Sequence, residues 1–100
     1  MIVIRQTKLF ADWVASLRDE NAIARINIRI RRLSLGNPGD TKSVGAGVSE
    51  MRVDYGPGYR LYFTRRGLNI VLLICVGDKR TQAADIARAK ALAQETTDDT

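Results

Sequence analysis

Two short stretches hold the basic side chains that are candidates for chemistry. The segment EMRVDYGPGYRLYF contains Arg52, Arg60 and Tyr62, and the apolar run NIVLLICV is followed shortly by Lys79 and Arg80. Arginine binds phosphate oxygens as a two-pronged fork, and lysine adds a point charge. Together with a tyrosine, these side chains predict a site for an RNA backbone.

The composition limits the reaction that such a site can perform. The chain has no histidine, which excludes Ser-His-Asp and Cys-His triads, and no metal-ligand spacing is visible, so we expect no metal and no cofactor. RNA supplies its own nucleophile, the 2′-hydroxyl, and a cleaving protein mainly aligns it and stabilises the charged phosphorane. We expect Arg60, Arg80 and Lys79 to supply that stabilisation, with Lys79 or, less favourably, Tyr62 as general base.

Two strands joined at Gly56-Pro57-Gly58 must position the hairpin arginines. A three-residue loop pairs Val53 with Leu61 and Met51 with Phe63, which keeps one face apolar. It also places Gly58 where the loop needs a positive φ. The sequence therefore predicts a register that separates the core from the charged residues.

The same register places Asp54 beside Arg60 and Arg52 beside Tyr62. The opposite face is then polar and consists of Glu50, Arg52, Asp54, Arg60, Tyr62 and Thr64. Such a face is either the wet side of an antiparallel sheet or a binding surface. Because Arg60 points away from the core in this register, Arg60→Ala is expected to remove activity and keep the fold.

Apolar periodicity and turn residues predict the other elements. Strands are expected at residues 2–5, 48–55, 59–66 and 69–76; helices follow Thr7, span 21–35 and follow Thr81, with both threonines as N-caps. GNPGDTKSVGAG reads as a loop, and residues 69–76, apolar on both faces, as the most central of the last three strands. The order β-α-α-β-β-β-α predicts an α+β fold, an antiparallel sheet with helices packed on it. We expect one domain over residues 1–95 and a flexible acidic tail over 96–100.

The second helix carries a basic ridge. Arg25, Arg29 and Arg32 recur at helical spacing, opposite an apolar stripe that includes Ile26 and Leu33. This ridge is either a solvated helix face or a binding surface.

The overall charge favours an anionic partner. The chain has 16 Lys and Arg against 11 Asp and Glu, a net charge of +5, which suits a polyanion or an acidic protein. The single cysteine, Cys75, lies in an apolar run, which indicates an inert buried thiol and a reducing compartment. Neither a signal peptide nor a run of membrane-spanning length is apparent, so we expect a cytoplasmic protein with no membrane partner.

Two motifs give the chain a family resemblance. GYRLYF resembles the GYR segment of the RelE/ParE superfamily of bacterial type II toxin-antitoxin modules. VGDKRTQAADIARAKALA is similar to the ending of a HigB-like branch, the addiction-module killer proteins. The resemblance covers roughly residues 1–95 and implies a RelE-like microbial RNase fold that cleaves mRNA on the translating ribosome.

The resemblance also implies roles for individual residues. Arg60 corresponds to a phosphate-stabilising arginine, Arg80 to a basic residue after the central strand with Lys79 beside it, and Arg52 to a lysine of RelE-type toxins. Arg52, Tyr62 and Lys42 are the predicted RNA-binding residues. The chain departs from that pattern at Asp54, where those toxins have a second lysine, and at Ile86, where RelE has a tyrosine. The catalytic histidines of HigB toxins have no counterpart.

The implied partners are mRNA, the ribosome and a cognate antitoxin of helix-turn-helix type, which would connect the pair to operator DNA. Two alternatives stay open. The protein is a gyrase poison of the ParE kind, or it is a weak toxin retained for antitoxin binding, in which Asp54 and Arg60 form a harmless ion pair.

Overall fold

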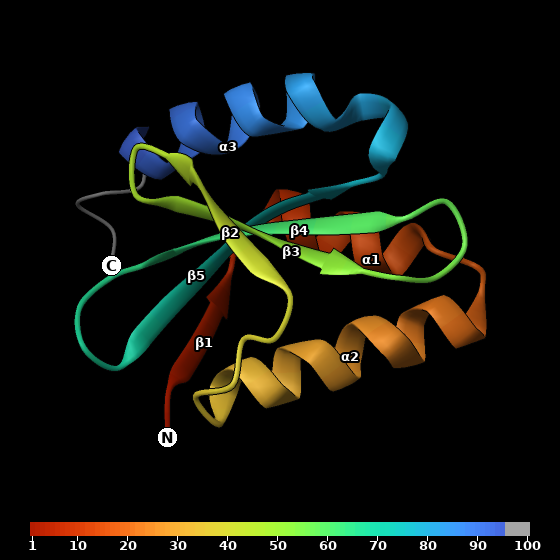
Figure 1. Cartoon of the computed structure of the whole chain (residues 1–100), viewed down its shortest axis with the longest axis horizontal. Helices are drawn as coiled ribbons and strands as arrows, with labels where there is room; N and C mark the ends of the chain where they lie inside the picture. The colour runs from red at the N-terminus through yellow and green to blue at the C-terminus, as the bar shows by residue number, and fades with distance from the viewer. Residues whose placement is uncertain (96–100) are drawn as a thin grey trace.

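Five strands form one mixed sheet in the order β1-β5-β4-β3-β2 (Figure 1). The strands are β1 (Val3–Gln6), β2 (Thr41–Gly45), β3 (Val48–Val53), β4 (Tyr59–Arg65) and β5 (Ile70–Gly77). The structure is a computed structural model that describes residues 1–95, and the predicted acidic tail at 96–100 lies outside the described residues. The α+β class is confirmed, and β4, instead of β5 as predicted, lies in the middle of the sheet.

The sequence had predicted an antiparallel sheet, and this is wrong for one pair of strands. β1 runs parallel to β5, whereas β2, β3, β4 and β5 pair antiparallel in succession. Tight hairpins force neighbouring strands to run in opposite directions, but β1 reaches β5 across the whole intervening chain. Its direction is therefore set by packing and not by a turn.

Strand β2 occupies part of the segment that reads as a loop. It pairs with β3 through a turn at Ala46 and Gly47, whose φ values of 54° and 76° are both left-handed. This combination is typical of a two-residue hairpin turn. The prediction of a loop was wrong because the segment is rich in glycine, which is typical of turns. Its short edge strand forms only by hydrogen bonding to β3.

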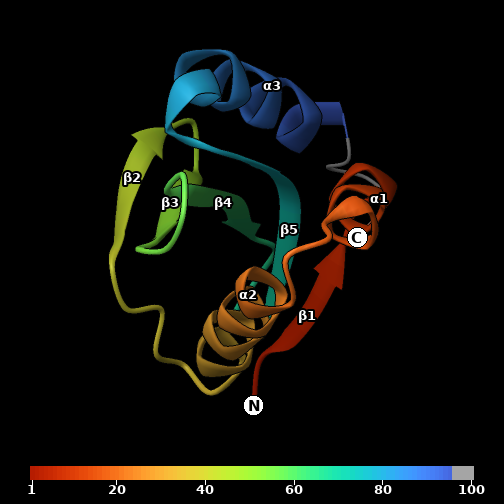
Figure 2. The same cartoon turned by 90° about the vertical axis from the view of Figure 1, so that its right-hand side faces the viewer.

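Three helices cover the two faces of the sheet. Helices α1 (Lys8–Ser16) and α2 (Glu20–Ser34) lie on one face, and α3 (Gln82–Glu95) lies on the other (Figure 2). Thr7 caps α1 as predicted, because its side chain accepts a hydrogen bond from the Phe10 N–H at 3.0 Å. Thr81 was predicted to cap α3, and this is wrong: it ends a 3-10 turn, Lys79–Thr81, whose cap is Asp78.

The sheet has an apolar layer on each face. The layer between the sheet and helices α1 and α2 includes Phe10, Ile26, Leu33, Met51, Leu61, Phe63, Val71 and Leu73. The layer between the sheet and α3 consists of Val48, Tyr62, Leu72, Ile74, Cys75, Ala89 and Ala93. Burial of Cys75 agrees with the prediction. No helix within residues 1–95 has the length and apolar character needed to cross a membrane.

Candidate functional site

The β3–β4 register brings two arginines together. Arg52 lies directly opposite Arg60, and Val53 opposite Tyr59, so five residues form the loop where three had been predicted. Both loops leave the same residues on each face, but the predicted partners are wrong. The wider loop is possible because Gly56 and Gly58 are both left-handed, with φ of 58° and 81°. The expected Asp54–Arg60 pair is therefore not formed, since Asp54 belongs to the loop.

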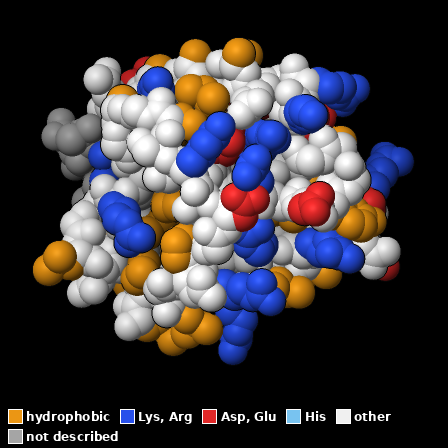
Figure 3. Space-filling view, in the orientation of Figure 1, with side chains coloured by type: hydrophobic (Ala, Val, Ile, Leu, Met, Phe, Trp, Pro, Cys, Tyr) orange, Lys and Arg blue, Asp and Glu red, His pale blue; other side chains and the backbone are white. Residues whose placement is uncertain are grey.

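Both arginines line a hollow of about 350 Å³. The hollow lies beside the 3-10 turn that precedes α3. Its charged residues are Arg52, Arg60 and Lys79, together with the carboxylates of Asp40 and Asp54. The space-filling view shows blue and red side chains side by side in the middle of this face (Figure 3), which in the same orientation lies between α3 and α2 (Figure 1). The hollow therefore has three basic and two acidic side chains, an excess of one positive charge.

Asp40 neutralises one of the two arginines. Its Oδ1 lies 3.0 Å from Nη2 of Arg52, and both side chains are about half exposed. The hydrogen bond from Arg52 holds the pKa of Asp40 below its ordinary value, with help from the charges of Arg29 and Arg60. The same bond raises the pKa of Arg52. Arg52 is thus already engaged by an anion of the protein.

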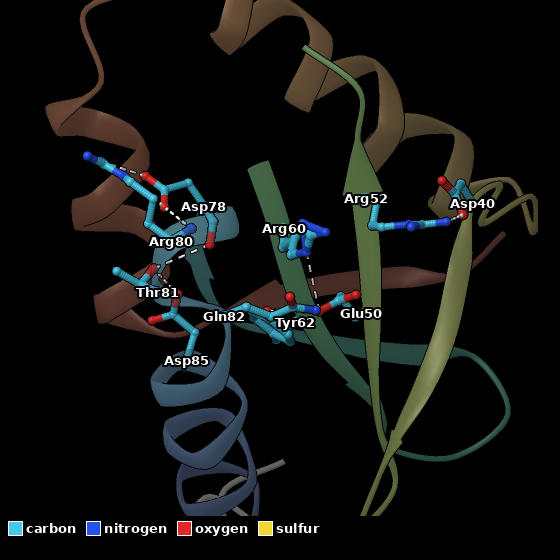
Figure 4. Close-up of polar contacts among 10 residues, drawn as sticks. All are labelled: Asp40, Glu50, Arg52, Arg60, Tyr62, Asp78, Arg80, Thr81, Gln82 and Asp85. Carbon is cyan, nitrogen blue, oxygen red and sulfur yellow. Dashed lines mark hydrogen bonds and ion pairs between the residues drawn. The ribbon is translucent and has the colours of Figure 1, made fainter. Parts of the chain in front are cut away.

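A buried carboxylate stands behind the other arginine. Glu50 is completely buried, and its Oε2 accepts hydrogen bonds from the Tyr62 hydroxyl at 3.0 Å and the Gln82 side-chain amide at 2.8 Å. Nε of Arg60 lies 3.6 Å from the same oxygen (Figure 4). Thr64, on the same face, is buried as well. Helix α3 therefore covers the inner half of the predicted polar face.

Tyr62 is not available to contact RNA. Its side chain is fully buried, in contrast to the prediction of an RNA-binding residue. Burial, reinforced by the hydrogen bond to Glu50, raises the pKa of the Tyr62 hydroxyl. The phenol therefore keeps its proton and cannot serve as a general base.

The 3-10 turn sends Lys79 and Arg80 in different directions. Lys79 lines the hollow. Arg80 is exposed and bound to Asp78, with 2.9 Å between Nη2 and Oδ2, and its side chain points away from Arg60 (Figure 4). The hydrogen bond from Arg80 lowers the pKa of Asp78. The structure does not bring Arg80 to the other predicted catalytic residues.

Neither Lys42 nor the basic ridge lines this hollow, but the ridge borders a neighbouring hollow that shares Val53 and Asp54 with it. Lys42 is exposed on edge strand β2, opposite Glu50. On α2, the Arg29 guanidinium donates to the backbone oxygens of Arg52 and Pro38, so part of the ridge has a structural role. Arg25 lies over the ring of Tyr55, 4.8 Å from its centre.

Sequence reasoning missed Asp40, Glu50 and Gln82 as members of this site. Glu50 was placed on a polar face that was either solvated or a binding surface, and its burial was not predicted, although β5 is apolar on both sides and an Ala-rich helix follows it. A strand that is apolar on both sides needs cover on both faces. That pattern was the signal that α3 would bury part of the polar face.

The fold and site define an α+β protein with a basic hollow at the end of a hairpin, beside the start of a covering helix. An uncharacterized protein of Haemophilus influenzae is 49% identical over 94 residues, which cover 94% of this chain and 95% of the relative. The chain belongs to the same family as this Haemophilus protein. No protein-family model matches the chain. Within residues 1–95, no group of three or more His, Cys, Asp or Glu residues has a metal-binding arrangement.

Proposed function

We propose that the protein is the toxin of a type II toxin-antitoxin module, with a RelE-like microbial RNase fold, and that it cleaves mRNA on the ribosome. The observation that carries the proposal is the convergence of Arg60, Lys79 and Arg52 on one open hollow. The motif resemblance described above and the α+β element order support it.

Arg60 is the main candidate for the phosphate. Its Nη1 and Nη2 atoms form no hydrogen bond with any described residue, while the residue itself lines the hollow. A guanidinium whose two terminal nitrogens are not hydrogen-bonded can donate to two oxygens of one phosphate. Lys79 adds a second positive charge, whereas Arg52 is held by Asp40.

The proposed reaction uses the substrate's own nucleophile. The 2′-oxygen forms a bond to phosphorus while the bond from phosphorus to the 5′-oxygen breaks, which gives a 2′,3′-cyclic phosphate and a 5′-hydroxyl. The proton lost by the 2′-hydroxyl is balanced by the one that the leaving oxygen gains. Arg60 and Lys79 stabilise the extra negative charge of the phosphorane, so the reaction needs no histidine and no metal.

Sequencing of mRNA 5′ ends from cells that express the protein tests this proposal. New 5′-hydroxyl ends should appear within translated frames, and Lys79→Gln should reduce them by about 10²-fold, the usual loss for one transition-state donor. Arg88→Gln removes the same charge from the exposed surface of α3, outside the hollow, and is the matched control. Intact mRNA during growth arrest, with inhibition of purified gyrase, would instead establish the gyrase-poison alternative.

The proposed module includes an antitoxin with a helix-turn-helix domain, through which the pair binds operator DNA. An acidic antitoxin segment suits the net charge of +5, since opposite charge speeds association. Co-expression of the neighbouring gene should restore growth and yield a complex that survives gel filtration. Persistent toxicity and separate elution would contradict this partner.

A further inference from the structure

Glu50 is an unusual residue for the place it occupies. Its side chain is completely buried, and Oε1 has no hydrogen-bond partner among the described residues. Its other oxygen, Oε2, accepts from two neutral groups, the Tyr62 hydroxyl and the Gln82 amide. Neutral donors orient a carboxylate but do not cancel its charge, and a buried charge without a counterion is costly.

Arg60 is the cation that compensates this carboxylate. Its side chain is only 12% exposed, and the distance from Nε to Oε2 of Glu50 is 3.6 Å, close enough for an ion pair but not for a hydrogen bond of ordinary length. The contact is made through Nε, on the inner edge of the guanidinium. Because Arg60 also lines the hollow, its two terminal nitrogens are the guanidinium atoms left for a ligand there.

We propose that Glu50 is the positioning residue for Arg60: its buried carboxylate, fixed by Tyr62 and Gln82, fixes the guanidinium so that both terminal nitrogens face a phosphate in the hollow. This inference deepens the proposed function and rests on it. Arginine has many rotamers, and a site that holds it before substrate arrives avoids the entropic cost of ordering it later. Glu50 itself does not line the hollow and therefore touches no substrate.

Two neighbours hold the carboxylate in place. Gln82 is the first residue of α3, so one hydrogen bond connects the covering helix to the carboxylate behind Arg60. Tyr62 reaches it from β4, two residues after Arg60 on the same strand. The support therefore comes from a strand and a helix, which are rigid elements, and not from the hairpin loop.

The test compares wild-type protein with Glu50→Gln, which keeps the size of the side chain and removes its charge. Nitrogen-15 NMR of the Arg60 Nε–H group should show slow hydrogen exchange and restricted motion in the wild type, and both should be lost in the variant. Titration with inorganic phosphate should shift this signal at a lower concentration in the wild type. Cleavage of mRNA should fall by about 10²-fold, as expected when a catalytic group is misplaced.

Asp12→Asn is the matched control because it removes one negative charge from an exposed ion pair on α1. It should leave the Arg60 signal and cleavage unchanged. If Glu50→Gln does not fold, Glu50→Asp replaces it: this variant keeps the charge but withdraws the carboxylate by one methylene, and the same losses should appear in smaller measure.

The outcomes separate the two proposals. An Arg60 signal that stays ordered in the Glu50 variants overturns the positioning role, whether or not cleavage falls. Wild-type protein that shows the ordered signal and its loss in Glu50→Gln, yet cleaves no mRNA, supports the Glu50–Arg60 relationship and refutes the nuclease. A phosphate affinity that is equal in wild type and variant refutes the positioning role directly.

Discussion

Arg52 and Arg60 face each other across β3 and β4, and each has a carboxylate of a different kind. The partner of Arg52 is Asp40, on the surface at 3.0 Å, and the partner of Arg60 is Glu50, in the interior at 3.6 Å. Like charges on opposed strand positions destabilise a sheet unless they are neutralised. The two carboxylates therefore offset the repulsion between the opposed arginines.

Phosphate should stabilise the wild-type protein more than chloride at equal ionic strength. A ligand present at 100 times its Kd adds about 2.7 kcal/mol to the free energy of unfolding. Lys79→Gln should reduce the rise in Tm, because Lys79 lines the hollow, whereas Arg88→Gln should not. Thermal denaturation in the two salts measures this, and an equal rise in both would contradict the anion site.

Arg60→Ala should destabilise the protein, in contrast to the expectation from sequence that the fold would be unaffected. Removal of one partner from a buried ion pair costs about 3–5 kcal/mol, and Glu50 is completely buried. The double variant with Glu50→Gln should lose less than the sum of the two single losses. Urea denaturation of the four proteins gives the coupling, and strictly additive losses would show that the two residues act independently.

The expected loss of stability in Arg60→Ala makes that variant unsuitable as the only test of activity. Loss of toxicity in Arg60→Ala would combine loss of chemistry with loss of folded protein. Arg60→Lys keeps a cation near Glu50 and removes the fork, so it should retain most of the stability and lose cleavage. Circular dichroism of the variant checks the first part before cleavage is measured.

Gly77→Ala should disturb the packing of the first turn of α3 on β5 and lower the free energy of unfolding. A Cβ atom there would lie 1.7 Å from Oδ2 of Asp85 and 2.9 Å from Oγ1 of Thr81. These two residues are joined by a 2.5 Å hydrogen bond, and Asp85 is buried. Overpacking of this kind costs about 1–3 kcal/mol, which denaturant unfolding will measure.

The control for that variant is Gly67→Ala. Unlike Gly77, Gly67 has no atom within 4 Å of the position of an added Cβ, although its φ of +110° is strained for alanine. Only the backbone cost of about 1 kcal/mol should appear. Equal losses in the two variants would contradict a steric role for Gly77.

Arg80→Gln should reduce cleavage less than Lys79→Gln. Both variants remove one positive charge from adjacent residues, but Arg80 is paired with Asp78 and only Lys79 lines the hollow. Comparison of the new mRNA 5′ ends in the two variants checks this. A larger loss for Arg80 would favour the catalytic role predicted from sequence.

The free energy of unfolding should fall as the pH rises from 9 to 11. Burial, with a smaller contribution from Asp85, raises the pKa of the Cys75 thiol from 9.0 to about 11. The folded state therefore holds its proton more tightly, and deprotonation favours the unfolded chain throughout this interval. Denaturant unfolding at several pH values should show the decline, and Cys75→Ala should make it shallower; an unchanged slope would exclude the thiol as its cause.

Some features of this protein follow from its sequence alone. The cap of α1 at Thr7 depends on a contact with Phe10, three residues away. The alternation of β3 and β4 separates the core from Arg52 and Arg60, whether three residues or five join the strands. These features are local, because the groups that determine them are neighbours on one helix turn or one strand.

The tertiary structure alone decided the site. Gln82 and Glu50 are 32 positions apart, and their hydrogen bond forms only when α3 packs on the sheet. That packing buries Tyr62, makes Glu50 a support for Arg60 and leaves Lys79 at the hollow while Arg80 turns away. Burial and strand register depend on contacts between distant segments, and the pattern of residue types along the chain records which faces are apolar but not what covers them.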